Sequence, residues 1–466
     1  MCELENQGYE QGPSACRPTN AVLRSIRKEI RNARALSAAD VRLASHMGLI
    51  SMDMSHRTGF NDGLFYPPGD SDPGLAPTNH PLRAGRMPRA EPGVDAPARK
   101  LHAIALLVDF PDLKGSRLPT SFSRMLFDKS NPDSMASIYL DMSYGKLDVS
   151  GEVVGWIRMP KPYSYYTSGQ SGTGSAYPNN TPGLLFDALT EFCKNDSLKR
   201  FDVDGDGYVD GIFLIHAGNG AEAEPDPAKR KDMIWSHKWT LPQPFQNKGV
   251  RVYAYSTEPE DGRVGVFSHE FGHVLGLPDL YDTSYRSEGV GDWCLMGGGS
   301  WGGNGLKPTR MSCWSLSKLG WIKPRKAKSA KYALSTLEKD PNACLWAWTG
   351  GKSGPEYFLI ENRQATGRDV SLPGSGLAIW HIDESQSDNS NPLAYKVGLV
   401  QADGLRDLEL GKNRGDAGDV FPGTSGVTRI DDTTTPSTQS NSGQKTKIVL
   451  SAISVKAGEA SIRIKV

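Results

Sequence analysis

Apolar and polar positions divide the chain into a helical start, a mixed central region and a strand-rich end. Apolar residues recur at helical spacing between residues 20 and 36, which predicts one amphipathic helix there. From residue 99 onward the spacing changes repeatedly between strand-like and helix-like periods. The elements expected in this region are strands at residues 102–110, 211–216 and 250–255, a pair of strands within 146–159, and helices at 184–194 and 264–275. Strands mixed with helices indicate an α/β or α+β domain over residues 99–326, and we expect the α+β class.

After residue 331 the pattern contains strands and turns only. The expected strands lie at residues 357–361, 377–382, 397–402, 447–451 and 461–466. We therefore expect residues 327–466 to form a second, β-rich domain. Residues 1–60 are expected to form a small helical region, and residues 61–98, which hold eight prolines, an extended linker.

The overall composition narrows the class of protein. Lysine plus arginine and aspartate plus glutamate each total 53, so the formal net charge is zero. A neutral chain gives no support for a nucleic-acid partner, whose phosphates call for a basic surface. No apolar run approaches the roughly 18 residues that span a bilayer, so no transmembrane segment is expected. The six cysteines form no C-x-x-C pair, which argues against a structural zinc knuckle.

The segment SHEFGHVLGLPDLYD carries the strongest chemical signal. His269 and His273 are four residues apart, which on a helix places both imidazoles on one face within reach of one ion. A catalytic zinc site needs three protein ligands and an open position for water, and imidazole nitrogen is a good ligand. Gly276 can end the helix in a left-handed turn that returns the chain toward the metal, where Asp279 would be the third ligand. Glu270, beside the first histidine, is the candidate general base.

The full spacing of this segment reads H-E-x-x-H-x-x-G-x-x-D, the long metzincin consensus with aspartate in place of the third histidine. Metzincins also place a methionine in a tight turn beneath the metal, and Met296 in the sequence CLMGG fits that position. Cys294 is predicted to be a small buried residue rather than a ligand, since the zinc set is complete without it. These features predict a metzincin-like zincin catalytic domain over residues 99–326, followed by the C-terminal β-rich domain.

A second cation site is predicted in the segment DVDGDGYVD. Four carboxylates recur there at short intervals: Asp202, Asp204, Asp206 and Asp210. Alternate aspartates with a glycine at the sixth position wrap a hard cation with oxygen ligands, and without a cation they repel one another. Phe213 stands where an EF-hand has its glutamate, so the loop is not a complete EF-hand. We expect structural calcium here, and the alternative is an acidic turn that precedes a strand.

Other titratable residues carry weaker signals. A further group of aspartates in the strand-rich region could bind another ion: Asp403, Asp407, Asp416 and Asp419. Loops are rich in aspartate even without a cation, so the pattern favours an ordinary loop. His216 and His237 are predicted to have structural roles rather than to bind the zinc.

Together these motifs resemble those of the immune inhibitor A-type secreted bacterial metallopeptidases, the sixth numbered metallopeptidase family. The resemblance is carried by the segments GVFSHEFGHVLGLPDLYD, FDVDGDGYVDGIFLIHAG, WSHKW, LMGGGSW, LGW and LPGSGLAIWHID. It is strong over residues 100–326 and moderate over 327–466, and it puts residues 1–98 at the position of the family's propeptide. The family is normally exported, which implies an extracellular protein, whereas residues 1–12 are polar and lack the apolar core of a signal peptide.

The motif and the resemblance together imply a zinc-dependent endopeptidase that acts on protein or peptide substrates, with Glu270 as general base. Two other functions stay open: a non-catalytic zincin-fold binding module, and a zinc amidase that acts on a non-protein amide. The retained glutamate argues against the first of these. Residues 250–255 are a candidate edge strand for aligning an extended peptide, and Tyr281 or Tyr285 is a candidate for stabilising the oxyanion. Neither cleavage preference nor oligomeric state follows from the sequence.

The N-terminal region is expected to keep the enzyme latent as a zymogen. Arg83, Arg86 and Arg89 in the proline-rich linker are sites for a trypsin-like protease. A thiolate is a strong zinc ligand, so Cys16 could take the fourth coordination position if residues 1–60 fold back over the cleft. The alternatives are an N-terminal region that blocks the cleft by its shape, and thiols without a role.

Overall fold

The computed structural model describes residues 17–33, 98–352 and 354–466. Helix α1 (Asn20–Ala33) confirms the helix expected near the N-terminus. Cys2, Cys16 and almost all of the proline-rich linker lie outside the described residues. None of the helices within the described ranges has the length and the apolar character that a membrane-spanning segment needs.

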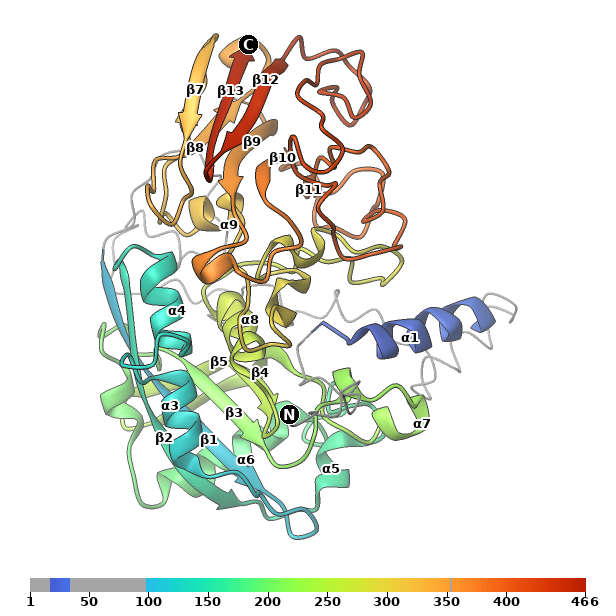
Figure 1. Cartoon of the computed structure of the whole chain (residues 1–466). Coiled ribbons are helices and arrows are strands. Elements are labelled where there is room, and N and C mark those ends of the chain that lie inside the picture. The colour runs from blue at the N-terminus through green and yellow to red at the C-terminus, as the bar shows by residue number, and fades with distance from the viewer. Residues whose placement is uncertain (1–16, 34–97, 353) are drawn as a thin grey trace, which may run out of the picture.

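A five-stranded sheet forms the centre of the region that precedes the C-terminal strands, and it is drawn in blue to green in Figure 1. In spatial order, its strands are β2 (Leu147–Arg158), β1 (Arg99–Asp109), β3 (Ile212–His216), β5 (Val250–Pro259) and β4 (His237–Asn247). β1, β2, β3 and β5 run parallel to one another, whereas β4 is antiparallel to β5. Parallel strands of this kind are usually covered by helices on both faces.

Helices cover both faces of this sheet. The helices after α1 are α3 (Pro119–Leu126), α4 (Met135–Met142), α5 (Tyr163–Thr167), α6 (Thr181–Cys193), α7 (Pro227–Arg230), α8 (Val264–Val274) and α9 (Cys313–Lys318). Ala103 and Ala105 of β1 belong to the core that α3, α4 and α8 share. Ile104 and Leu106, which point to the opposite face, belong to the core that α5 and α6 share. The region is therefore a mixed α and β structure, as the sequence predicts.

Residues 146–159 do not form the expected pair of strands. They form the single strand β2, and its Gly151 pairs with Ala103 of β1. A Cβ atom at Gly151 would lie 2.4 Å from the Phe127 ring and 2.6 Å from the carbonyl oxygen of Ala103. The glycine therefore permits a close approach within a continuous strand and does not mark a turn.

The expectation that residues 250–255 form an edge strand is wrong. These residues belong to β5, which lies between β3 and β4 and is buried along almost its whole length. The polar side chains of this segment have local partners. The Arg251 guanidinium lies 4.0 Å from the centre of the Tyr208 ring. The Tyr255 hydroxyl donates to Oγ1 of Thr181 at 2.8 Å. The strand at this edge of the sheet is β4.

Two further sheets, mostly antiparallel, make up the C-terminal part of the chain, orange to red in Figure 1. Their orders are β11-β10-β9-β8-β6 and β12-β13-β7. The strands are β6 (Arg325–Lys326), β7 (Ala330–Leu334), β8 (Cys344–Ala347), β9 (Glu356–Arg363), β10 (Gly376–Asp383), β11 (Val397–Leu399), β12 (Val449–Lys456) and β13 (Glu459–Lys465). Each of the five strands expected after residue 331 overlaps one of these. One continuous apolar core, with buried residues from Leu101 to Ile464, joins the helical region to both sheets.

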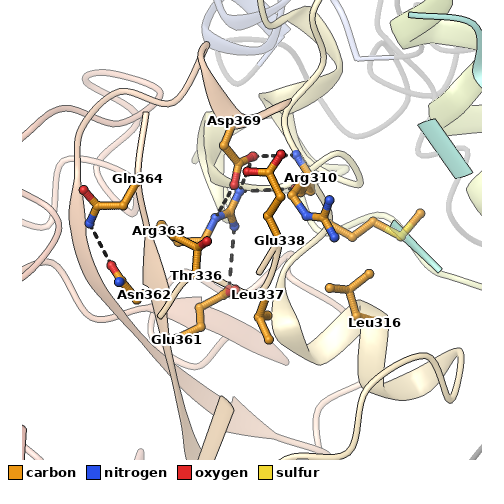
Figure 2. A pocket seen from close by; sticks show the side chains of 11 residues that line it. Arg310, Leu316, Thr336, Leu337, Glu338, Glu361, Asn362, Arg363, Gln364 and Asp369 are labelled. Atoms are coloured by element: carbon orange, nitrogen blue, oxygen red, sulfur yellow. Dashed lines mark hydrogen bonds and ion pairs between the residues drawn. The ribbon is translucent and has the colours of Figure 1, made fainter. Parts of the chain in front are cut away.

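A buried group of charged side chains lies where the helical region meets the C-terminal sheets (Figure 2). Arg363 of β9 makes two hydrogen bonds of 2.9 Å to the Asp369 carboxylate. The main-chain N–H of Arg310 donates to the same carboxylate at 2.8 Å. Arg363 also donates to the carbonyl oxygen of Trp293 at 3.0 Å. These charge-assisted hydrogen bonds tie the C-terminal sheet to the segment around Trp293.

Candidate metal centre

Helix α8 carries the two histidines of the predicted zinc motif, and all of its residues are buried. It ends in the way that the sequence predicts. Gly276 has a φ of +98°, a left-handed conformation that favours glycine. The N–H of Leu277 then donates to the carbonyl oxygen of Gly272 at 3.0 Å. This turn reverses the chain and brings Asp279 back to the histidines.

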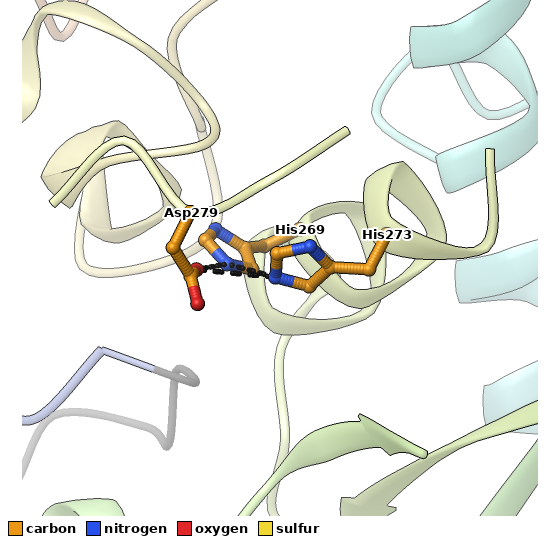
Figure 3. Close-up of side chains that lie close together, drawn as sticks. All are labelled: His269, His273 and Asp279. Carbon is orange, nitrogen blue, oxygen red and sulfur yellow. Dashed lines mark hydrogen bonds and ion pairs between the residues drawn. The ribbon is translucent and has the colours of Figure 1, made fainter. Parts of the chain in front are cut away.

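His269, His273 and Asp279 converge on one point, as Figure 3 shows. The Nε2 atoms of the two imidazoles lie 3.0 Å apart. Oδ1 of Asp279 lies 3.0 Å from Nε2 of His269 and 3.1 Å from Nε2 of His273. Both histidine side chains are fully buried, and that of Asp279 is 7% exposed. The structure therefore brings together the three residues that the sequence predicts as ligands.

Main-chain carbonyl groups fix the orientation of both imidazoles. Nδ1 of His269 lies 2.8 Å from the carbonyl oxygen of Leu295, and Nδ1 of His273 lies 2.7 Å from that of Leu277. Because a carbonyl oxygen only accepts, each Nδ1 carries the proton and each Nε2 presents a lone pair. The two Nε2 lone pairs and Oδ1 of Asp279 therefore face one another without a proton between them to form a hydrogen bond. A cation about 2 Å from each atom satisfies all three, and this set of donor atoms fits zinc.

The protonation states of these groups suit metal binding. Burial lowers the pKa of His269, which keeps this imidazole neutral and able to bind a metal. Burial alone would raise the pKa of Asp279. The neighbouring His273 and His269 outweigh burial, so the pKa of this carboxyl lies well below its usual range. The imidazole is therefore neutral and the carboxylate ionised, as metal ligands must be.

The predicted methionine turn lies directly against α8. A Cβ atom at Gly272, between the two histidines, would lie 2.4 Å from Sδ of Met296. The methionine thus occupies the space that a larger residue at this position would need. The carbonyl oxygen of Leu295 orients His269, and that of Met296 accepts the N–H of Leu280 at 2.8 Å. The turn supports both the helix and the loop that carries Asp279.

Cys294, at the start of this turn, is a buried structural residue, as predicted. Its Sγ accepts the N–H of Ser312 at 3.2 Å and lies 3.9 Å from Oγ of Ser315. Burial raises the pKa of the thiol, which keeps it protonated. Within the described ranges, this cysteine belongs to no group of side chains that could hold a metal ion.

The candidate base and the candidate oxyanion donor lie close to the ligands. Glu270 is fully buried on α8, next to His269 in the chain. The ring centroid of Tyr281 lies 6.2 Å from that of His269. Tyr285 stacks on Tyr281 with a centroid distance of 6.4 Å. Of the two tyrosines, Tyr281 therefore packs against His269, a candidate metal ligand.

The segment that leads into α1 reaches the same region. Arg17 is 1% exposed, and its guanidinium lies 5.6 Å from the centre of the Tyr281 ring. Arg17 also forms a buried ion pair with Glu288, and its carbonyl oxygen accepts Nε1 of Trp301 at 3.0 Å. Arg27 of α1 contacts the same Glu288 at 2.8 Å. Sequence reasoning missed Glu288, because no local pattern links positions so far apart in the chain.

The loop before β3 brings three of the four predicted calcium ligands together. Carboxylate oxygens of Asp202, Asp204 and Asp210 lie within 4.8 Å of one another. Asp206 is not part of this group, and its Oδ1 accepts the N–H of Tyr208 at 2.8 Å. One oxygen each of Asp202 and Asp210 is buried without a hydrogen-bond partner in the described part of the chain. Burial raises the pKa of Asp210 to about 7, and the charge of Asp204 adds to that shift.

His216 and His237 make contacts away from the zinc motif, which agrees with structural roles. Nδ1 of His216 lies 2.9 Å from the carbonyl oxygen of Ala217. Nε2 of His237 lies 2.9 Å from Oγ1 of Thr181. Neither histidine belongs to a possible metal-binding group among the residues that the structure describes.

Comparison with known proteins identifies the class of the catalytic region. Residues 118–323 match the family model described as immune inhibitor A peptidase M6, catalytic domain. Immune inhibitor A of Bacillus thuringiensis subsp. alesti is 31% identical over 277 residues, which cover 48% of this chain and 40% of that protein. The pre-pro-metalloprotease PrtV of Vibrio cholerae serotype O1 is 30% identical over 312 residues, which cover 55% of this chain and 34% of that protein.

Residues 118–323 are therefore similar to the catalytic domain of a metallopeptidase. More narrowly, the match is to the immune inhibitor A family of peptidases, which confirms the resemblance seen in the sequence motifs. The chain spans only 40% and 34% of the lengths of these two relatives.

Proposed function

We propose that the protein is a zinc-dependent endopeptidase, with His269, His273 and Asp279 as zinc ligands and Glu270 as general base. The observation that carries this proposal is the convergence of two oriented Nε2 lone pairs and one carboxylate oxygen on a single point. The match to a peptidase family supports the reaction class independently. The contact of Met296 with α8 favours a metzincin-like zincin fold.

The chemistry divides between the metal and the side chains around it. A zinc ion held by these ligands supplies the Lewis acidity that activates water near neutral pH and polarises the scissile carbonyl. Glu270 accepts the proton of the attacking water and transfers it to the leaving amine. Tyr281, whose ring packs against His269, donates a hydrogen bond to the developing oxyanion.

An extended peptide substrate pairs with β4, which takes the role that the sequence suggested for residues 250–255. In the described sheet, β4 has a neighbouring strand on one side only. Main-chain groups on the other side can therefore pair with an extended chain. Because α8 packs against both β4 and β5, this edge lies close to the helix that carries the ligands.

Residues 1–60 act as a pro-region that restricts access to the metal centre. The support is Arg17, which contacts the ring of Tyr281 and pairs with Glu288. Cys16 directly precedes this arginine in the chain and lies outside the described residues. A thiolate bound to the metal and a block by shape are both compatible with the Arg17 contacts.

Activity before and after cleavage of the linker at residues 61–98 tests this latency. Intact protein should have low activity, and a cut between Arg83 and Arg89 should raise it. The variant Cys16→Ser should be active without cleavage if the thiol binds the metal, and latent if the block depends on shape. Equal activity of intact and cleaved protein would show that the region is not inhibitory.

Calcium is the proposed structural ion at Asp202, Asp204 and Asp210, with the charge of Asp206 nearby. The buried oxygens of this loop that have no hydrogen-bond partner within the described ranges support a bound cation.

The proposed organisation is a catalytic domain at residues 99–326 followed by a β-rich domain at residues 327–466. An extracellular location is proposed from the family resemblance. The substrates are proteins or peptides, as expected of a peptidase.

Degradation of casein or gelatin by the purified chain, after cleavage of the linker, tests the proposed activity. The expected result is proteolysis that a zinc chelator abolishes and added zinc restores. Zinc binding without any hydrolysis would instead favour the non-catalytic binding module. Hydrolysis of simple amides without proteolysis would favour the amidase.

A further inference from the structure

A second cluster of aspartates lies in the loops that follow β11 in the C-terminal part of the chain. Carboxylate oxygens of Asp403, Asp416 and Asp419 lie within 4.8 Å of one another. A calcium ion about 2.4 Å from each oxygen can bridge oxygens up to about 4.8 Å apart. The cluster is therefore compact enough for one ion to contact all three side chains.

Asp419 distinguishes this cluster from an ordinary acidic loop, because its side chain is almost completely buried, with 1% exposed. Oδ2 accepts hydrogen bonds of 2.9 Å from Nε1 of Trp293 and from the N–H of Asp416. Oδ1 is buried and has no hydrogen-bond partner among the described residues. An ionised oxygen in this environment is costly unless a cation or a proton compensates it.

The backbone at Gly418 allows the other two carboxylates to approach each other. A Cβ atom at this position would lie 2.4 Å from Oδ2 of Asp403 and 2.9 Å from Oδ1 of Asp416. A residue with a side chain would force these carboxylates apart. The glycine thus keeps two like charges close together, an arrangement that is unfavourable without a cation.

The basic side chains of the same loop are engaged elsewhere. Lys412 contacts Asp407 at 2.8 Å. Arg414 lies 3.7 Å from Glu288, on the side of the N-terminal segment. In the Asp202 loop, by contrast, Arg99 partly compensates the acidic group through its contact with Asp204 at 2.9 Å.

We infer that Asp403, Asp416 and Asp419 bind a calcium ion, at a site separate from both the zinc ligands and the Asp202 loop. Three carboxylates without a nitrogen or sulfur ligand select a hard cation over zinc. Magnesium usually keeps several of its waters and uses one or two carboxylates, so three carboxylates favour calcium. This inference does not depend on the proposed peptidase activity.

The position of this site gives the ion a structural role at the zinc motif. Trp293, which donates to Asp419, immediately precedes the turn that contains Met296. The N–H of Asp292 donates to the carbonyl oxygen of Arg414 at 2.7 Å, so a second contact joins the loop to this segment. An ion that fixes the loop also fixes Trp293, and through it the turn that packs against α8.

Calcium binding by the full chain tests the inference. Bound ions are removed with EGTA, and calcium per chain is then measured by equilibrium dialysis for the wild type, Asp403→Asn and Asp407→Asn. Asp407 is the matched control, because it lies in the same loop but contacts Lys412. Asp403→Asn should bind one calcium ion fewer per chain than the wild type, and Asp407→Asn should bind as many as the wild type.

Terbium luminescence excited through tryptophan identifies the site, because the indole of Trp293 contacts Asp419. The signal should be lost in Asp403→Asn and kept in Asp407→Asn and in Asp204→Asn. Equal calcium binding and equal luminescence in the wild type and Asp403→Asn would overturn the inference. Circular dichroism checks that each variant folds. If Asp403→Asn does not fold, terbium soaked into wild-type crystals decides: a peak among the three carboxylates supports the site, and its absence overturns it.

Discussion

The zinc motif and the Asp202 loop differ in how completely the protein builds each site without a metal. At the zinc motif, two carbonyl groups orient His269 and His273, and both side chains are fully buried. In the loop, Asp204 is exposed and contacts Arg99, whereas Asp202 and Asp210 each keep a buried oxygen without a hydrogen-bond partner in the described part of the chain.

This difference indicates what each proposed metal contributes to the protein. Neutral imidazoles with a fixed Nδ1 proton can keep their geometry before a metal binds. Aspartates repel one another until a cation binds, so the proposed calcium ion would order the loop. We therefore expect zinc to supply chemistry to a preformed site, and calcium to supply mainly stability.

Removing the base without disturbing the ligands should have the largest effect. Glu270→Gln should lower peptidase activity by about 100-fold or more, in line with the loss of general acid–base catalysis. Because the ligands are preformed, zinc content should stay near one per chain, measured by elemental analysis. Glu191→Gln on the surface of α6 is the matched control and should keep wild-type activity. Wild-type turnover in Glu270→Gln would refute the assigned role.

Removing a carboxylate from the Asp202 loop should change the stability of the protein rather than its peptidase activity. Binding to the folded state alone raises the free energy of unfolding by about 2.7 kcal/mol at a hundredfold excess of ligand over the dissociation constant. Asp204→Asn should therefore lose much of the calcium-dependent rise in Tm. Asp206→Asn, whose carboxylate binds the N–H of Tyr208 outside the cluster, should lose less. The same calcium response in the wild type and in Asp204→Asn would exclude this loop as an ion site.

Adding a methyl group at Gly272, between the two histidines of α8, tests how tightly Met296 packs against this helix. In Gly272→Ala the new methyl carbon would lie 2.4 Å from Sδ of Met296. Overpacking of this kind lowers the free energy of unfolding by about 1–3 kcal/mol. The cost should be smaller when alanine also replaces Met296, because the space is then free. Urea denaturation of the two single variants and the double variant measures this coupling. Additive effects would mean that the methionine does not limit the space beside α8.

The smallest expected effect is on the pH dependence of stability, and it comes from His216, a buried histidine away from the zinc motif. Nε2 of His216 has no hydrogen-bond partner among the residues that the structure describes, and burial lowers its pKa to about 4. The unfolded chain therefore binds a proton at higher pH than the folded chain, and stability is lost as pH falls. Between about pH 6.5 and 5.5 this histidine should account for about 1 kcal/mol of lost stability.

Urea denaturation at both pH values, for the wild type and His216→Gln, checks this pH dependence. The variant should lose less stability than the wild type over that interval. An identical loss in both proteins would show that His216 does not titrate differently in the folded state.

The convergence of His269, His273 and Asp279 could be predicted because it depends on local geometry. Helical spacing sets the distance between His269 and His273, and one glycine turn returns the chain to Asp279. The grouping of the carboxylates in the Asp202 loop was less predictable, because spacing alone does not show which way each carboxylate points. Gly205 and Gly207 both have positive φ, at 72° and 83°. Their left-handed conformations flank the one aspartate that the structure leaves out of the cluster.

Contacts between distant parts of the chain escaped prediction from the sequence. Alternation in residues 250–255 indicated a strand but could not show that β4 covers its outer side. The single strand at residues 146–159 was not predicted, because the close contact of Gly151 with β1 involves residues far away in sequence. The pairing of Arg17 with Glu288 and the burial of Asp419 likewise depend on packing between segments that no local pattern connects.

The central claim is that His269, His273 and Asp279 hold a zinc ion, and anomalous diffraction at the zinc absorption edge tests it most directly. Crystals of the full chain, grown without added metal other than zinc, should give an anomalous peak in contact with both Nε2 atoms and with Asp279. The peak should vanish when data are collected below the edge, which identifies the element. A zinc peak elsewhere with none between these three side chains would contradict the account.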